Sequence, residues 1–439
     1  MLRIMTTSLD RRRFIAATSS AFAALAASGC KASVPGRPQA QVYGPLVPDA
    51  GGLLDLPKGF SYRVISKLGD AMSDGGTVPD AADGMGCIAL PGGKLALIRN
   101  HELKVGRDSG GASGLSFDRD SAGNLVPGGT TTLILDAQTL VLEREFRSLT
   151  GTIRNCSGGV TPWGSWLTCE EDVTKAGAKV GQDHGWVFEV SASATGPVDP
   201  VPLKAMGRFN HEAACVDPAS GMVYLTEDRE DSLLYRFVPA VPGQLSKGGK
   251  LEALALAESS AVIAPGDWRS VRWIALDNVE SPDDDLRKRG AALGAYTFAR
   301  GEGIHMGATA RGKSELYFAS TSGGAAKLGQ VWRLRLGAGA NKLQLFFEST
   351  DPAQFNYGDN LCVAPGGHLI VCEDQYTDPP NNHLRGLTPA GLPYDFALVR
   401  TKTEPAGACF SPDGKVLFVN LYSPTATLAI TGPWTHLKA

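Results

Sequence analysis

Short apolar stretches alternate with Pro- and Gly-containing turns along most of this chain. Six segments share one plan, in which a polar or acidic residue opens a short strand, a turn follows, and a second β-rich strand closes on polar or acidic residues. Two such strands joined by a tight turn predict a β-hairpin. The six segments are residues 83–102, 155–171, 210–228, 302–321, 359–374 and 404–422.

A further strand-like run follows most of these hairpins, as in residues 185–190, 234–238 and 330–334. Six small antiparallel sheets built on one plan predict an all-β fold, namely a six-bladed β-propeller with loop and short helical insertions. Residues 281–289 begin with acidic and end with basic side chains, which predicts one such surface helix. We therefore expect residues 58–439 to form a single propeller domain.

The N-terminal residues predict export rather than folded structure. Arg11, Arg12 and Arg13 precede a weakly apolar, Ala-rich run, a pattern typical of a twin-arginine signal peptide over residues 1–30. Cys30 ends a sequence like a lipoprotein processing site, so a lipid anchor to a membrane is one expectation. The expected partner is the twin-arginine export machinery, and the expected location of this monomer is periplasmic or extracellular.

Residues 31–57 are rich in Pro, Gly and Ala, and this composition predicts a tether between the signal and the propeller. The whole chain has a formal net charge of −3, which argues against nucleic acid as a specific partner. Its 53 glycines and 27 prolines favour many turns over long helices. The absence of GxSxG, Walker and dinucleotide-binding motifs argues against a serine hydrolase or a nucleotide-dependent enzyme.

Acidic residues recur at matching ends of the predicted hairpins. In a propeller the start of the innermost strand and the end of its neighbour share one face, so these side chains converge at one mouth of the central channel. Their mutual repulsion requires compensation, which metal cations provide. The converging residues are Asp83, Glu102, Cys156, Glu170, Glu171, Glu212, Glu227, Asp228, Glu302, Asp359, Glu373, Asp374 and Glu404.

The residue types indicate which cations this mouth would hold. Carboxylates suit a hard ion such as calcium, and the thiolate of Cys156 indicates an additional transition ion, with iron the reasonable choice. His101, His211 and His305 are scattered, so we interpret them as supporting or structural residues rather than as a zinc site. Four further cysteines fall inside apolar strands and are expected to be small buried residues, namely Cys87, Cys215, Cys362 and Cys409.

Arg300 stands two residues before Glu302, so in strand-like backbone both side chains face the same way. A guanidinium beside a cluster of cations can bind a bridging anion such as phosphate. The alternative is a structural ion pair between Arg300 and the acidic residues.

Several of these segments resemble the PhoX-type alkaline phosphatases, and the resemblance spans residues 57–437. The segments that carry it are RNHE at 99–102, NCSGGVTPWGSWLTCEE at 155–171, GRFNHEA at 207–213, YLTEDR at 224–229, FARGEG at 298–303, DNLCVAPGGHLIVCED at 359–374 and EPAGACFSPDGKVLFVN at 404–420. The sequence departs from the family at Ser157, where Ala is usual, and at Tyr357-Gly358, where Pro is usual.

The resemblance implies an exported phosphomonoesterase that hydrolyses small phosphate esters with a ferric iron pair and calcium ions. Cys156 resembles the family's thiolate ligand and Arg300 its phosphate contact, which makes these two the expected catalytic residues. The matching acidic ligands are Glu171, Glu212, Glu302, Asp359 and Glu404. The hairpin pattern adds Glu102 to these expected metal ligands.

Two other functions fit the same pattern. A calcium-dependent lactonase or esterase on a propeller would need oxygen ligands alone and would leave Cys156 without a role. A non-enzymatic propeller of the cell envelope would use its metals only for stability.

Overall fold

The computed structural model describes residues 39–434 except 112–113, 259–262, 309–313, 338–340 and 376–380. The predicted signal peptide 1–30, Cys30 and the first part of the predicted tether lie outside the described residues. Among the described residues, none of the helices has the length and apolar character that a membrane span requires.

All six predicted hairpins are present in the folded unit of residues 37–439. The first strands are β4 (Ala82–Leu90), β8 (Asn155–Val160), β11 (His211–Val216), β18 (Gly301–Ala308), β22 (Gly358–Val363) and β26 (Pro405–Phe410). Their antiparallel partners are β5 (Lys94–His101), β9 (Ser165–Glu170), β12 (Val223–Glu227), β19 (Ser314–Ser320), β23 (Leu369–Glu373) and β27 (Val416–Leu421).

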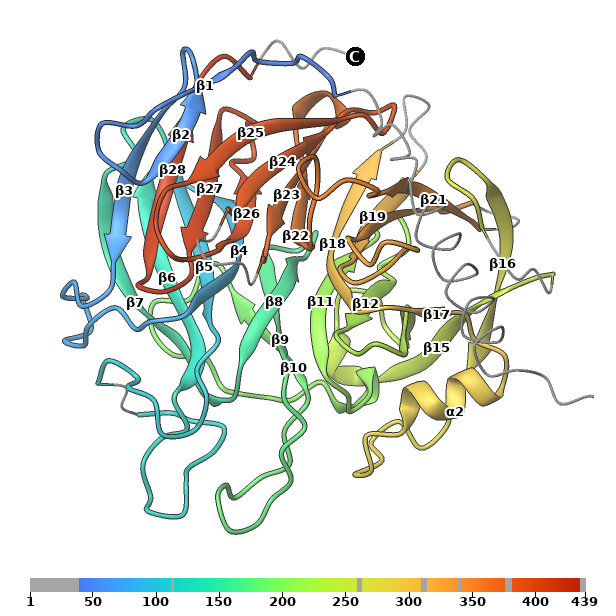
Figure 1. The fold of residues 1–439 in the computed structure, drawn as a ribbon. Coiled ribbons are helices and arrows are strands. Elements are labelled where there is room, and N and C mark those ends of the chain that lie inside the picture. Colours follow the sequence, from blue (N-terminus) through green and yellow to red (C-terminus); the bar gives the residue numbers. More distant parts are fainter. Residues whose placement is uncertain are drawn as a thin grey trace, which may run out of the picture. The chain divides into compact units, whose positions relative to one another are not determined.

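The six first strands pack side by side in a closed circuit, β4–β8–β11–β18–β22–β26, and β26 returns to β4 (Figure 1). These inner strands line a central channel, and further strands extend each hairpin outward. The outer strands include β6 (Gly128–Asp136), β7 (Leu142–Thr152), β10 (Val187–Ser191), β14 (Tyr235–Pro239), β15 (Gly249–Leu256), β20 (Gln330–Arg335), β21 (Lys342–Glu348), β24 (His383–Leu387), β25 (Pro393–Val399) and β28 (Ala426–Thr431).

The fold is thus all-β and propeller-like, but it does not divide into six separate blades. β16 (Trp268–Ala275) pairs with both β15 and β21, and so joins two hairpins and their outer strands into one nine-stranded sheet. The short strands β13 (Ser232–Leu233) and β17 (Thr297–Phe298) pair with each other beside this sheet. The predicted surface helix is α2 (Leu286–Ala292), which begins later than the charge pattern indicated.

An early strand of the chain pairs with the last strand and so closes the circuit. β3 (Ser61–Lys67) pairs with β28 and completes the four-stranded sheet of β26. β2 (Leu54–Pro57) is buried and pairs with β25, while β1 (Leu46–Val47) pairs with β2. The prediction of a tether as far as residue 57 is therefore wrong for these strands, because β2 pairs with β25 and buries Leu54 and Leu56 in the adjoining core.

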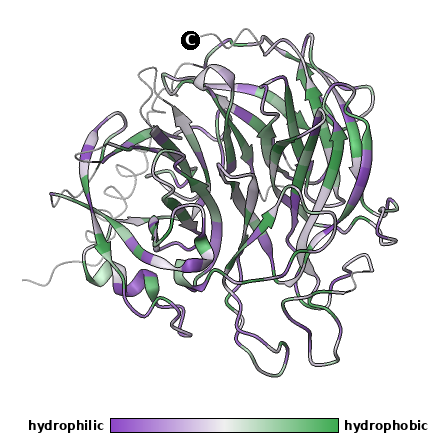
Figure 2. Ribbon diagram, turned by 180° about the vertical axis from the view of Figure 1, so that it is seen from behind, coloured by the Kyte–Doolittle hydropathy of each residue, from purple (hydrophilic) through white to green (hydrophobic). Residues whose placement is uncertain are grey.

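The apolar runs form strands that are buried on both faces. In β27, Leu417 and Val419 pack against the sheet of β22, whereas Val416 and Phe418 pack against the sheet of β4. Alternate residues of a strand face opposite sides, so every residue of such a run lies in a core between two sheets. Figure 2 accordingly shows hydrophobic strands and more hydrophilic connecting loops.

Close approach of the inner strands requires small residues near the channel. A Cβ atom at Gly159 of β8 would lie 2.0 Å from the carbonyl oxygen of Ala214 in the neighbouring β11. The glycine-rich sequence of β8 is therefore explained by the spacing of the inner strands.

We expect Gly159→Ala to lower the free energy of unfolding by about 1–3 kcal/mol, because the backbone of β11 must shift to accept the methyl group. Gly196→Ala is the matched control, since a Cβ there meets nothing within 4 Å. Chemical denaturation of both variants checks this, and equal stabilities would contradict the packing argument.

Candidate metal centre

The register of every inner strand is interrupted close to its start. Pairing skips from Ala82 to Met85 in β4, and β8, β11, β18, β22 and β26 carry a similar irregularity. Such bulges change the direction in which the neighbouring side chains point. Five potential ligands lie within these irregular segments, namely Asp83, Cys156, Glu212, Glu302 and Asp359.

The second strand of a hairpin supplies a further acid just beyond its last paired residue. Glu102, Glu171, Asp228 and Asp374 occupy this position after β5, β9, β12 and β23. Consecutive side chains face opposite sides, so the preceding residue of each pair points elsewhere.

The prediction that both members of each acidic pair converge is therefore wrong for the first members. Glu170 accepts hydrogen bonds from the backbone N–H groups of Ile153 and Gly185, and Glu227 accepts one from the hydroxyl of Tyr235. Glu373 likewise accepts hydrogen bonds within its own sheet, from Arg385 and the backbone N–H group of Asn356. These carboxylates anchor neighbouring segments instead of facing the channel mouth.

Six of the remaining acids and Cys156 form three groups, in each of which the potential ligand atoms lie within 4.8 Å of one another, whereas Asp228 and Asp374 belong to none. The groups are Asp83, Glu102 and Cys156; Cys156, Glu171 and Glu212; and Glu212, Glu302 and Asp359. Cys156 and Glu212 each belong to two groups, so the three groups form one continuous cluster. The structure thus brings together six of the seven predicted ligands and adds Asp83.

Glu404, the seventh predicted ligand, lies in none of the three groups. It precedes β26, whereas the ligand in each of the other inner strands follows the first paired residue of that strand. Ala406 occupies the position in β26 that acids occupy in the other inner strands. Glu404 lies instead within hydrogen-bond reach of Asp374, and burial followed by Asp374 raises its pKa well above the usual value.

Burial raises the pKa values of the clustered acids, and neighbouring carboxylates add to the effect. The pKa of Glu171 rises to about 8 and that of Asp359 to about 7. The pKa values of Asp83, Glu212 and Glu302 are raised well above their usual range for the same reasons. The anionic forms are therefore costly unless positive charge lies between them.

Several ligand atoms have no hydrogen-bond donor among the described residues. Both carboxylate oxygens of Glu212 and Oδ1 of Asp83 are buried without an N–H or O–H partner. The thiol of Cys156 lies 3.4 Å from Oδ2 of Asp83, and burial followed by the nearby carboxylates raises its pKa. Buried anionic donors without a hydrogen-bond partner can be stabilised by bound cations, so the residues of this donor set fit a metal site.

Two arginines supply positive charge beside the cluster. Arg300 donates from Nε to Asp228 (2.8 Å) and from Nη2 to Glu302 (2.8 Å). Arg154 donates from Nε to Glu102 (2.6 Å) and from Nη2 to Glu171 (2.5 Å). The structural ion pair considered for Arg300 is thus present, and Arg154 is a residue that the sequence analysis missed.

Neither guanidinium can act as an acid here. Burial lowers the pKa of each group, but the nearby carboxylates outweigh burial and raise both pKa values above the ordinary value for arginine.

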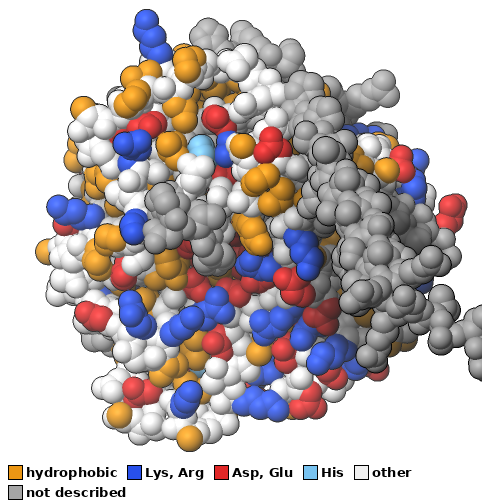
Figure 3. Space-filling model, in the orientation of Figure 1, with side chains coloured by type: hydrophobic (Ala, Val, Ile, Leu, Met, Phe, Trp, Pro, Cys, Tyr) orange, Lys and Arg blue, Asp and Glu red, His pale blue; other side chains and the backbone are white. Residues whose placement is uncertain are grey.

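Figure 3 shows acidic side chains gathered near the middle of one face with Lys and Arg side chains around them.

Among the described residues, none of the three donor groups includes a histidine. His101 is hydrogen-bonded to the carbonyl oxygen of Asp80 and to Thr131, and His211 to the carbonyl oxygen of Gly207. His305 donates from Nδ1 to the carbonyl oxygen of Met306 in the channel. These contacts give each of the three rings a partner in its own surroundings, and Nδ1 of His211 is buried without a partner among the described residues.

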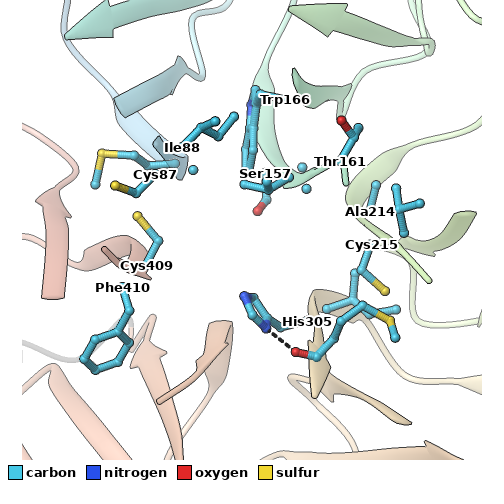
Figure 4. Close-up of a pocket in the computed structure, with 18 of the residues that line it drawn as sticks. Cys87, Ile88, Ser157, Thr161, Trp166, Ala214, Cys215, His305, Cys409 and Phe410 are labelled. Carbon is cyan, nitrogen blue, oxygen red and sulfur yellow. Dashed lines mark hydrogen bonds between the residues drawn. The ribbon is translucent and has the colours of Figure 1, made fainter. Parts of the chain in front are cut away.

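Behind the cluster the channel opens into a cavity of about 640 Å³ (Figure 4). All six inner strands contribute to its wall, and none of the lining residues that the structure describes is Asp, Glu, Lys or Arg. Cys87, Cys215 and Cys409 lie in this wall, and they and Cys362 are free and buried, as predicted. In the described part of the channel, charged side chains therefore gather at the end that holds the three donor groups.

Glu170 belongs to a second buried network beneath the metal centre. His184 bridges Glu170 (Nδ1 to Oε1, 2.6 Å) and Asp118 (Nε2 to Oδ2, 3.1 Å). Burial lowers the pKa of His184, but the two carboxylates outweigh burial and raise it above the ordinary histidine value. The protonated imidazole consequently stabilises the segment that carries Glu171.

This network predicts a pH-dependent loss of stability in His184→Gln. A raised folded-state pKa means that the stabilisation is fully present below about pH 6.5, the ordinary histidine pKa, and disappears as pH rises through the folded-state pKa. The difference in free energy of unfolding between wild type and variant should therefore shrink with rising pH. Denaturant titrations across this range check it, and a constant difference would contradict it.

Comparisons with known proteins identify the family and the fold of this chain. The sequence pattern of the family described as alkaline phosphatase PhoX matches residues 41–139 and 131–425. No curated protein sequence is significantly similar to the chain. A solved structure of Pseudomonas fluorescens PhoX in complex with vanadate, a transition state analogue, has a TM-score of 0.67 at 18% identity, over 90% of this chain and 97% of that chain.

A gluconolactonase from Xanthomonas campestris has a TM-score of only 0.40 at 13% identity, over 92% of this chain and 99% of that chain. The similarity to Pseudomonas fluorescens PhoX concerns the fold, whereas the family pattern covers most of the chain. This protein belongs to the alkaline phosphatase PhoX family.

Proposed function

We propose that this protein hydrolyses small phosphate monoesters at a cation cluster held in the mouth of its channel. The single observation that carries this proposal is the continuous cluster of three donor groups linked through Cys156 and Glu212. Family membership supports the phosphatase activity, and the buried, unpartnered oxygens of Asp83 and Glu212 support a site built for cations.

The proposed cations are ferric iron and calcium. Cys156 is the one thiol of the cluster, and a thiolate among carboxylates suits iron better than calcium. The Glu212, Glu302 and Asp359 group contains oxygen donors alone, as calcium prefers. When bound, such cations would stabilise negative charge on a phosphoryl group as Lewis acids.

The protein's own residues would bind and orient the ester. Arg300 is held by Asp228 and Glu302, and among the described residues its Nη1 donates to no protein acceptor. These free N–H groups can donate to phosphoryl oxygens beside the cluster. The two carboxylates fix the guanidinium before substrate arrives, which reduces the entropy lost on binding.

The proposal includes the architecture and the cellular setting. The closed circuit of six inner strands supports a six-bladed propeller in which two blades share β16. Arg11, Arg12 and Cys30 support export by the twin-arginine route to the periplasm or the exterior, with a lipid anchor at Cys30. We propose a monomer as the active form.

We expect Cys156→Ala to lose iron and phosphatase activity while the protein stays folded, because the thiolate is shared by two donor groups. Elemental analysis and turnover of a chromogenic phosphate ester measure the two effects. Cys409→Ala, which removes a thiol from the neutral cavity, is the matched control and should keep both. Full activity in Cys156→Ala without iron, or wild-type turnover of a lactone but not of a phosphate ester, would refute the proposal.

For Arg300→Ala we expect KM for a phosphate ester to rise about 10- to 100-fold, as the loss of a charged hydrogen bond predicts. Steady-state kinetics separate this effect from kcat. Arg229→Ala is a suitable control, because Arg229 pairs with Asp284 beside the mouth. An unchanged KM together with an unchanged kcat would reject the role of Arg300 in substrate binding.

A further inference from the structure

Arg154 and Arg300 occupy the same position in the repeated hairpin. Each is the residue immediately before an inner strand, β8 for Arg154 and β18 for Arg300. Both adopt a left-handed backbone conformation that non-glycine residues rarely use, with φ of 47° and 54°. Ala81 before β4 and Tyr357 before β22 share this conformation, with φ of 55° and 54°, so it belongs to the repeated hairpin. Each guanidinium lies between two acids of the mouth, so the two residues are structural counterparts.

The two arginines differ in the N–H groups that remain for a ligand. All three nitrogens of Arg154 donate to protein acceptors, namely Nε to Oε1 of Glu102, Nη2 to Oε2 of Glu171, and Nη1 to the carbonyl oxygen of Glu171 at 2.8 Å. Only Nε and Nη2 of Arg300 do so among the described residues. Each guanidinium uses three of its five N–H groups in these bonds, so the two that remain lie together on Nη1 of Arg300 but on different nitrogens of Arg154. Arg300 therefore keeps one whole nitrogen for another partner, whereas every nitrogen of Arg154 is already held by a protein acceptor.

Arg154 also completes the support of the two carboxylates. The second oxygen of Glu102 accepts a hydrogen bond from the hydroxyl of Tyr422 (2.7 Å), and the second oxygen of Glu171 accepts one from Nδ2 of Asn210 (3.0 Å). Both oxygens of each carboxylate are thus oriented, in contrast to those of Glu212, which have no N–H or O–H donor among the described residues.

The carboxylates held by Arg154 belong to the two donor groups that share Cys156. Glu102 is grouped with Asp83 and Cys156, and Glu171 with Cys156 and Glu212. Without the guanidinium, Glu102 and Glu171 would repel each other and lose a fixed orientation. One side chain therefore sets the relative geometry of both groups.

We propose that Arg154 is a positioning residue, which orients Glu102 and Glu171 so that the Cys156 side of the cluster can bind cations, and that it does not contact the substrate. This inference rests on the proposed function, because it assigns a role within the same metal centre. A lysine cannot replace Arg154, since one ammonium group cannot match the three acceptors that the planar guanidinium reaches.

The test compares Arg154→Ala, Arg154→Lys and Arg300→Ala in the full chain. Chelator-treated protein is titrated with calcium and with iron separately, and the metal-loaded variants are assayed with a chromogenic phosphate ester. We expect both Arg154 variants to bind metal about 10- to 100-fold more weakly and to lose kcat to a similar extent, as loss of a ligand-orienting partner does. Their KM should stay within about twofold of wild type, whereas Arg300→Ala, which releases Glu302 but neither Glu102 nor Glu171, keeps its iron affinity and raises KM.

Arg236→Gln is the matched control, because Arg236 forms an ion pair with Glu252 on outer strands and should leave every readout unchanged. A raised KM with normal metal affinity in Arg154→Ala would make Arg154 a substrate contact and overturn the proposal. Wild-type metal affinity in both Arg154 variants would overturn it too. Arg154→Lys keeps a positive charge at this position, so it replaces Arg154→Ala as the test variant if the latter does not fold. Failure of the proposed function itself would show in the wild type, as absence of metal binding or of ester hydrolysis.

Discussion

Electrostatic repulsion among buried acidic groups at one mouth of the channel is the constraint on which the rest of this structure depends. Burial and mutual repulsion raise the pKa values of Asp83, Glu212 and Glu302 well above their usual range. Such groups can stay close together as anions only if positive charge is fixed between them. Arg154 and Arg300 neutralise the edges of the cluster, and the unpartnered oxygens at its centre leave the remaining compensation to cations.

The strand framework prevents the acids from relieving this repulsion by moving apart. Asn100 of β5 donates from Nδ2 to the carbonyl oxygen of Cys156 (3.1 Å) in the next hairpin. Asn420 of β27 donates in the same way to the carbonyl oxygen of Asp83 (2.6 Å). Both asparagines cross from one hairpin to the next and hold the irregular start of its inner strand. The closed circuit of inner strands then keeps the donor groups at fixed separations.

The same circuit separates charge along the channel. Side chains at the irregular strand starts face the acidic mouth, whereas residues a few positions later line a cavity without charged side chains. A neutral wall behind the cluster adds to the burial that raises the pKa of Cys156, and a bound cation would reverse that shift. The charged groups are therefore concentrated at the mouth, where Arg300 pairs with Glu302.

Local physics made much of this protein predictable from its sequence. Apolar runs broken by Gly and Pro turns define the six hairpins, because hydrophobic burial and turn preference act over a few residues. The recurrence of acids at the hairpin ends predicted their convergence, since hairpins with one plan place equivalent residues on one face. Cys156, Glu102, Glu212, Glu302 and Asp359 were identified in this way, whereas the choice of Glu171 over Glu170 came from the family resemblance.

Tertiary structure decided what depends on register and on contacts between distant segments. Whether Glu170 or Glu171 faces the mouth depends on strand pairing and on the bulge in β8, which no local pattern encodes. Arg154 gained its role only when folding brought Glu102 and Glu171 to its two sides. The pairing of β3 with β28 and the joining of two blades by β16 also unite residues far apart in sequence. Local sequence determined the repeating unit, whereas the closure of the circuit determined which side chains meet, because such contacts form only when all units pack together.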